Sequence, residues 1–216
     1  MGEWFNPSVL KTEESKGSVS SNLTASAKFM NQEFRDKIVQ YENVLTDKMF
    51  NEVRKHLGYP RWGLNLSDPA YQSHKIFWGM RLEKEKFFND TIFKIVKKLT
   101  KTNFKIHKVL ANAQSTLQDG SPHVDNHEKD TMTFILYANE TWDYQWGGQT
   151  IFFDRYQEIK DGKRETIVNS DDVYSIYPIP NTAVCFPSNM IHYAMGPNRD
   201  FYGIRYTVAY HLEIIK

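Results

Sequence analysis

The chain has 216 residues and a mass of 25.4 kDa, with 40% hydrophobic and 25% charged residues. Its aromatic content of 14% excludes wholesale disorder, because disordered chains are depleted in aromatic residues. Its 27 Lys and Arg nearly balance its 26 Asp and Glu, which leaves a net charge of +1, so we expect neither a nucleic-acid partner nor attraction to an anionic membrane.

The first 30 residues are expected to form a loosely structured arm. The segment KTEESKGSVSSNLTASAK is rich in Ser, Thr and Lys and has no hydrophobic period. The opening MGEWFNPSVL lacks the basic and apolar regions of a signal peptide. The sequence contains no run of 18 apolar residues, and its single cysteine, Cys185, cannot form an internal disulfide. These features favour a cytoplasmic protein.

Two helices are predicted in the first half of the chain. Thr46 can cap a helix over 47–57, and Gly58 with Pro60 can end it. A second helix is predicted over 85–101, where lysines collect near the C-terminal end, as the helix dipole favours. The apolar residues that recur at helical spacing in these regions are Val44, Leu45, Met49, Phe50, Val53 and Leu57, and then Phe87, Phe88, Ile92, Phe93, Ile95, Val96 and Leu99.

From residue 104 the hydrophobic pattern changes from helical to alternating. Strands are predicted over 104–118, 131–139, 150–153, 172–180, 182–187 and 203–215. Asp161-Gly162 is a strong hairpin signal. No helical segment alternates with these strands, which disfavours a parallel α/β sheet. We therefore expect an α+β, mainly β fold in a single domain over 31–216, with helical support over 31–103 and a barrel or two-sheet sandwich core over 104–216.

The segment DGSPHVDNH, residues 119–127, carries the main candidate site. His123 and Asp125 are two residues apart, so both side chains project to one face if the chain is extended there. His192 follows the strand predicted over 182–187 and can supply a third ligand. Two His and one Asp form the facial triad that suits non-haem Fe(II) and leaves positions open for a co-substrate and O2.

Other histidines offer alternatives. His123 and His127 are spaced i, i+4, as in a zinc-binding helix, but Gly120 and Pro122 favour a loop there. His211 lies on the last predicted strand and can point either into the barrel or out of it. A packing or surface role is the simpler interpretation of the remaining candidates, His56, His74, His107 and Cys185.

Arg205 lies on the last predicted strand, thirteen residues after His192. A guanidinium fixed inside a barrel needs an anion, and a dicarboxylate co-substrate supplies one that Arg can hold with two hydrogen bonds. Thr207 is two residues further on and faces the same way, so its hydroxyl can donate another bond. For Arg205 alone, a structural salt bridge or surface exposure would be an equally good interpretation.

The chain resembles the Fe(II)/2-oxoglutarate-dependent dioxygenases of the prolyl-4-hydroxylase-like group through His123-Val124-Asp125, then TFILYANETWDYQWGGQTIFF, then His192, then Arg205-Tyr206-Thr207. The resemblance covers about residues 104–212, and NVLTDKMFNEVRKHL resembles the helix that opens such domains. It implies a double-stranded β-helix, a jelly-roll or cupin-like barrel with supporting N-terminal helices. It also implies Fe(II), 2-oxoglutarate and O2, with ascorbate as a reductant.

The resemblance also implies roles for single residues. It makes the two histidines and the aspartate of the candidate triad the catalytic iron ligands, and it makes Arg205 the residue that holds the distal carboxylate of 2-oxoglutarate. Tyr137 matches a tyrosine that hydrogen-bonds the same carboxylate. Gln114 stands where many relatives carry a tyrosine near the co-substrate.

The activity that the resemblance implies is hydroxylation of an unactivated C–H, coupled to decarboxylation of 2-oxoglutarate to succinate and CO2. Related halogenases lack the carboxylate ligand, so Asp125 favours hydroxylation. A peptidyl substrate of the prolyl type is favoured. The alternatives are the same chemistry on a free amino acid or other small metabolite, and a jelly-roll binding domain without turnover.

Overall fold

A computed structural model describes residues 31–64 and 78–216. The arm expected over 1–30 and His74 lie outside these residues. The helices are α1 Gln32–Asp36, α2 Asp47–Leu57, the π-helix η1 Phe87–Ile92, α3 Phe93–Thr100 and the 3-10 helix η2 Tyr144–Trp146. The strands are β1 Val39–Tyr41, β2 Gly63–Leu64, β3 Trp78–Arg81, β4 Phe104–Gln114, β5 Thr131–Tyr137, β6 Thr150–Lys160, β7 Lys163–Ile176, β8 Ala183–Pro187, β9 Met190–Ala194 and β10 Arg205–Ile214.

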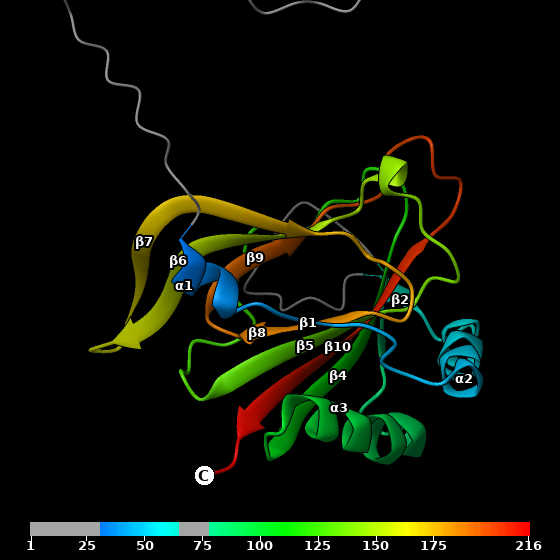
Figure 1. Cartoon of the computed structure of the whole chain (residues 1–216), viewed down its shortest axis with the longest axis horizontal. Coiled ribbons are helices and arrows are strands. Elements are labelled where there is room, and N and C mark those ends of the chain that lie inside the picture. The colour runs from blue at the N-terminus through cyan, green and yellow to red at the C-terminus, as the bar shows by residue number, and fades with distance from the viewer. Residues whose placement is uncertain (1–30, 65–77) are drawn as a thin grey trace, which may run out of the picture.

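The strands form two antiparallel sheets (Figure 1). The larger sheet has seven strands in the order β1-β8-β5-β10-β4-β3-β2, and the smaller has three in the order β7-β6-β9. Apolar side chains of both sheets form one cluster between them, in which Phe152 of β6 packs against Phe186 of β8 with ring centroids 4.9 Å apart. This is the double-stranded β-helix that the resemblance implies, and the mainly β prediction is confirmed.

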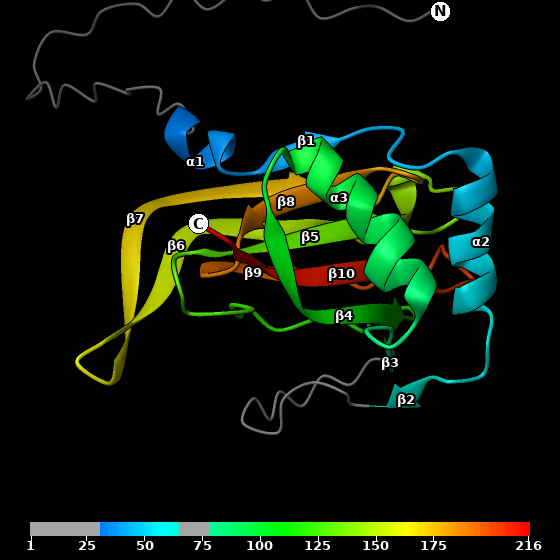
Figure 2. The ribbon, with the colours of Figure 1, turned by 90° about the horizontal axis from the view of Figure 1, so that it is seen from below.

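Helices α2, η1 and α3 pack against the outer face of the larger sheet, as Figure 2 shows for α3. Alternation along β10 turns Tyr210 to this face, where its hydroxyl donates to the carbonyl of Phe88 at 3.1 Å. The opposite face of β10 therefore carries Arg205, Thr207 and His211 toward the smaller sheet, inside the barrel. The fold thus separates an apolar supporting face from a polar interior.

The predicted helix boundaries hold for α2, where the Thr46 hydroxyl accepts from the backbone N–H of Met49 at 3.4 Å. Val44 and Leu45 do not belong to that helix: they are buried in the loop before it, where Asn181 hydrogen-bonds both the N–H and the carbonyl of Leu45. The second predicted helix begins with one π-helical segment and becomes α-helical only from Phe93.

The hairpin at Asp161-Gly162 is present, with positive φ at both residues, as a tight turn between twisted strands requires. It joins β6 and β7, which are longer than the predicted strands. Four strands were not predicted at all: β1, β2, β3 and β9. Three of them have two to four residues, which is too short for alternation to be recognised.

Candidate metal centre and co-substrate pocket

The segment that carries His123 and Asp125 is tied by its backbone to β9 and to the turn before it. His123 and His192 exchange two backbone hydrogen bonds, of 3.0 and 2.9 Å. The N–H groups of Asp125 and Asn126 both donate to the carbonyl of Ser188, at 2.9 and 3.2 Å. Residues far apart in the sequence are therefore held at fixed positions relative to one another.

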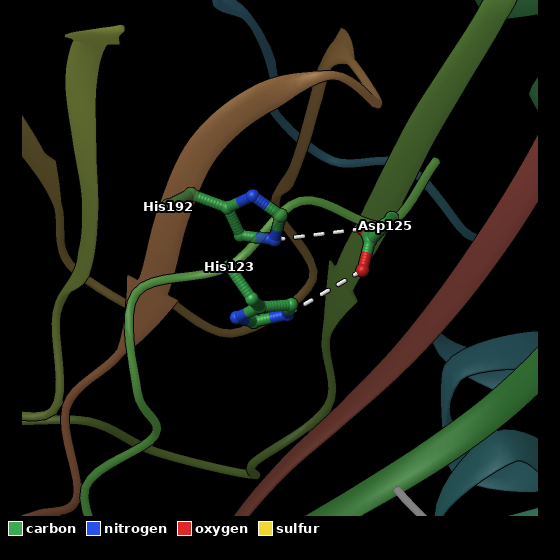
Figure 3. A group of neighbouring side chains, drawn as sticks. All are labelled: His123, Asp125 and His192. Atoms are coloured by element: carbon green, nitrogen blue, oxygen red, sulfur yellow. Dashed lines mark ion pairs between the residues drawn. The ribbon is translucent and has the colours of Figure 1, made fainter. Parts of the chain in front are cut away.

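This arrangement brings the three predicted ligands together (Figure 3). Nε2 of His123 lies 3.5 Å from Oδ1 of Asp125, and Nε2 of His192 lies 3.5 Å from Oδ2. One donor atom from each of the three residues lies within 4.8 Å of the other two. A single ion between them can reach all three donors.

The second nitrogen of each imidazole is already engaged. Nδ1 of His123 lies 2.8 Å from the carbonyl oxygen of Ser121, and Nδ1 of His192 lies 3.0 Å from that of Met190. A carbonyl only accepts, so each Nδ1 carries the proton and each Nε2 presents its lone pair toward the carboxylate. This is the tautomer that a metal-binding histidine needs.

Asp125 is oriented in the same way. The Thr133 hydroxyl donates to Oδ2 at 2.7 Å and lies 2.9 Å from the Ser188 hydroxyl. Burial opposes ionisation of Asp125, but the imidazoles of His211, His192 and His123 outweigh it and hold the pKa of this carboxyl well below its usual range. The carboxylate is therefore ionised at neutral pH.

The pKa values of the two histidines are shifted in opposite directions. Burial lowers the pKa of His192 to about 4, so this imidazole is neutral at physiological pH. Burial also acts against protonation of His123, but its interaction with Asp125 prevails and raises its pKa. A metal ion at this centre would therefore face more competition from protons at His123 than at His192.

The remaining histidines lie in different surroundings. His211 points into the barrel, with Nε2 3.9 Å from Oδ1 of Asp125, which resolves the orientation that the sequence left open. His127 is not part of the metal-capable group of the described residues. His56 stacks on Phe87, and exposed His107 pairs with Glu213, so both have structural surroundings.

Cys185 is buried in the larger sheet, as the packing interpretation predicts. Burial raises the pKa of its thiol to about 12, so the thiol is not a nucleophile at neutral pH.

Arg205 lies inside the barrel and is only 1% exposed; its partner Thr150 pairs with Ala194, two residues after His192. Its Nε donates to the carbonyl of Gly148 at 2.7 Å, one terminal nitrogen donates to the Gln114 side-chain oxygen at 2.8 Å, and the other donates to the Thr150 hydroxyl at 3.1 Å. No carboxylate of the described residues pairs with it. Burial lowers its pKa to about 10, so it remains a cation at neutral pH without a counter-ion.

The other predicted co-substrate residues surround this cation. The Tyr137 ring lies 5.8 Å from the guanidinium carbon, and its hydroxyl donates to Thr150 at 2.9 Å. Thr207 is buried on the same face of β10 as Arg205. Gln114 is the cross-strand partner of Arg205.

Sequence reasoning missed the hydroxyl-bearing residues Thr133, Thr150 and Ser188. Thr150 and Thr133 belong to predicted strands, and their alternation with buried apolar neighbours was the available signal. Their partners depend on strand register, which the sequence does not reveal.

The backbone conformation and close surroundings of residue 148 require a glycine. Its φ is +73°, and a Cβ atom there would lie 2.7 Å from the Trp142 ring and 3.3 Å from Cδ of Arg205. We expect Gly148→Ala to lower the free energy of unfolding by about 1–3 kcal/mol from backbone strain alone and to displace Arg205 as well. Denaturant unfolding together with 2-oxoglutarate binding measures both effects.

Gly162→Ala is the matched control, because Gly162 has the same φ of +73° with nothing within 4 Å of the added Cβ. This variant should have a lower free energy of unfolding because of the backbone strain, but it should bind 2-oxoglutarate as the wild type does. Equal binding by the two variants would show that Gly148 does not shape the pocket.

Residues 110–212 match the model of the 2OG-Fe(II) oxygenase superfamily. The match covers the barrel from β4 to β10, a little under half of the chain, and supports a 2OG-Fe(II) oxygenase of the prolyl-4-hydroxylase-like kind. This oxygenase is an oxidoreductase enzyme, and the matched family implies Fe(II) and 2-oxoglutarate. The donor set fits: two imidazoles and one ionised carboxylate converge, as ferrous iron requires. No curated protein matches the sequence.

Solved structures with similar folds include prolyl hydroxylases. The oxygenase is 16% identical to a Trichoplax adhaerens prolyl hydroxylase in complex with a hypoxia inducible factor peptide, with a TM-score of 0.60 over 82% of this chain and 83% of the other. It is 12% identical to a Pseudomonas putida prolyl-4-hydroxylase, with a TM-score of 0.50 over 83% and 94%. It is 10% identical to the epimerase SnoN from nogalamycin biosynthesis, with a TM-score of 0.59 over 82% and 78%. At these identities the likeness establishes the fold.

No helix among the described residues is both long and apolar enough to cross a membrane.

Proposed function

We propose that the oxygenase hydroxylates an unactivated C–H and couples this to decarboxylation of 2-oxoglutarate. One atom of O2 enters the substrate as hydroxyl and the other enters succinate, with CO2 released. The observation that carries this proposal is the pairing of two features in one barrel: a converged His-Asp-His group and a buried cation without a counter-ion. Ascorbate would act as a reductant that keeps the metal ferrous.

In this proposal His123, Asp125 and His192 hold the iron. Bound iron would supply the activation of O2, and this chain's own residues orient what reacts. The ionised carboxylate balances part of the metal charge, and the Nδ1 hydrogen bonds of the histidines hold the rings in the binding tautomer. The presence of Asp125 favours hydroxylation over halogenation, because halogenases of this kind lack that carboxylate.

Arg205 would bind the distal carboxylate of 2-oxoglutarate. The described part of the chain engages three of its five N–H groups and leaves two for a bidentate grip on a carboxylate. Tyr137 would act through Thr150 and not by touching the co-substrate, since its hydroxyl proton is directed to Thr150. Thr207 would donate a further hydrogen bond from the same strand face.

For the substrate we propose a peptide with a prolyl-like residue. Support comes from the barrel's similarity to a prolyl hydroxylase that was solved with a peptide. The second candidate is a small metabolite, and support for it is the similar fold of SnoN, which was solved in complex with nogalamycin RO.

A succinate-release assay tests the proposal. The protein is given Fe(II), ascorbate and 2-oxoglutarate with a panel of proline-containing peptides, and separately with free amino acids and small metabolites. We expect one panel member to gain 16 Da while an equal amount of succinate forms. Succinate formation coupled to a small molecule and to no peptide would favour the second candidate, and the absence of any 2-oxoglutarate consumption would contradict the proposed function.

A further inference from the structure

Gln114 is a buried amide that links Arg205 to the segments that carry the metal-capable group. It is the last residue of β4 and is 1% exposed. Its side-chain nitrogen donates to the carbonyls of Gln118 at 2.7 Å and Ala194 at 3.3 Å. Gln118 precedes His123 in the same loop, and Ala194 is the last residue of β9.

The chemistry of these neighbours fixes the orientation of the amide. The nitrogen faces two carbonyl oxygens, which only accept, and the oxygen faces Arg205, which only donates. If the amide were flipped, its nitrogen would face the Arg205 donor and its oxygen would face the two carbonyl oxygens, and no hydrogen bond could form. Gln114 therefore presents a neutral oxygen to the guanidinium in a single conformation.

Within residues 31–64 and 78–216, every hydrogen-bond partner of the Arg205 guanidinium is likewise neutral: the Gly148 carbonyl, the Gln114 oxygen and the Thr150 hydroxyl. These groups fix the plane of the guanidinium without cancelling its charge. A carboxylate at position 114 would have made the same hydrogen bond and neutralised the cation, and glutamate is the closest isostere of glutamine.

We propose that Gln114 is a positioning residue that makes the pocket selective for a dicarboxylate, because it holds Arg205 with a neutral acceptor and so keeps the cation unpaired for the distal carboxylate. This inference rests on the proposed function. It assigns to Gln114 a role that acts through Arg205.

The test compares two keto acids that differ only in the distal carboxylate. Binding of 2-oxoglutarate and of 2-oxovalerate is measured by calorimetry on the Mn(II)-loaded protein, which does not turn over. If Gln114 serves only the stability of the barrel, its replacement should weaken the binding of both keto acids equally. If Gln114 positions Arg205, its replacement should weaken the binding of 2-oxoglutarate alone.

Two variants separate charge from hydrogen bonding. Gln114→Met removes the acceptor and both donors at similar volume, and Gln114→Glu also removes the donors but adds a charge beside Arg205. We expect Gln114→Glu to lower the affinity for 2-oxoglutarate by about tenfold or more, which corresponds to the loss of one hydrogen bond to a charged group. Gln114→Met should lower this affinity less. Neither should change 2-oxovalerate binding by more than about twofold.

Gln40→Glu is the matched control, because it makes the same change on the exposed strand β1 and should bind both keto acids as the wild type does. The inference is overturned if Gln114→Glu binds 2-oxoglutarate as tightly as Gln114→Met does, or if both ligands weaken in parallel. If Gln114→Glu does not fold, the test uses Gln114→Met alone. Weaker binding of 2-oxoglutarate alone supports the inference, and equally weaker binding of both keto acids overturns it. A wild type without preference for 2-oxoglutarate over 2-oxovalerate would instead remove the proposed role of Arg205 itself.

Discussion

Replacement of His192 by alanine is expected to abolish 2-oxoglutarate turnover. The variant removes one of three converging donors, and it removes the one that is neutral and completely buried. Loss of a group that merely supports a metal ligand costs about 10–100-fold in metal affinity, so loss of a ligand should cost more. Fe(II) affinity, measured by anaerobic titration, and succinate formation should fall together.

His107→Ala is a matched control for this experiment. His107 is an exposed histidine on β4 that pairs with Glu213, well outside the metal-capable group. Its replacement should leave iron binding and turnover unchanged. Undiminished turnover by His192→Ala, in a variant whose melting temperature shows that it is folded, would remove His192 from the ligand set.

Replacement of Arg205 by alanine should chiefly raise the 2-oxoglutarate requirement. Truncating one partner of a buried, hydrogen-bonded charge pair typically costs about 2–5 kcal/mol, so we expect the 2-oxoglutarate concentration for half-maximal turnover to rise by roughly 30-fold or more. Iron binding in the absence of 2-oxoglutarate should change little, because no donor to the metal is lost. The ratio of the two effects distinguishes a co-substrate residue from a ligand.

Arg205→Lys refines this prediction. Lysine keeps the positive charge but loses the planar fork, so partial recovery of 2-oxoglutarate affinity is expected. The assignment fails if Arg205→Ala binds 2-oxoglutarate as the wild type does, or if its loss of iron affinity equals its loss of 2-oxoglutarate affinity.

The placement of His123 beside Asp125 could be anticipated from the sequence because it depends on a short-range feature. An extended His-x-Asp segment projects both side chains to one face, whatever the rest of the fold does. The position of His192 was harder to predict, because β9, which carries it, was not predicted as a strand. Backbone pairing with His123 sets the position of His192. From the residues alone, His192 was one candidate for the third ligand, and the resemblance assigned it that role.

The supporting residues could not be predicted because they depend on register between distant strands. The Gln114 side chain meets Arg205 only because β4 and β10 pair in the observed alignment, and a shift of one residue would turn either side chain away. The face of His211 did follow from alternation along β10: Tyr210, Leu212 and Ile214 pack in the outer core, so His211 points the other way, and the register shift after it skips a residue of β4 instead.

The fold class could be predicted from the change of hydrophobic period near residue 104. The π-helix at Phe87–Ile92 could not be predicted from the sequence. A π-helical segment has the same apolar stripe as an α-helix over so few residues, and packing against the sheet decides between them.

The most direct test of the account is a crystal structure of the protein grown anaerobically with Fe(II) and 2-oxoglutarate. We expect one iron bound by Nε2 of His123, a carboxylate oxygen of Asp125 and Nε2 of His192, with the distal carboxylate of 2-oxoglutarate on the two free N–H groups of Arg205. Iron at another position, or a 2-oxoglutarate molecule that does not reach Arg205, would contradict it.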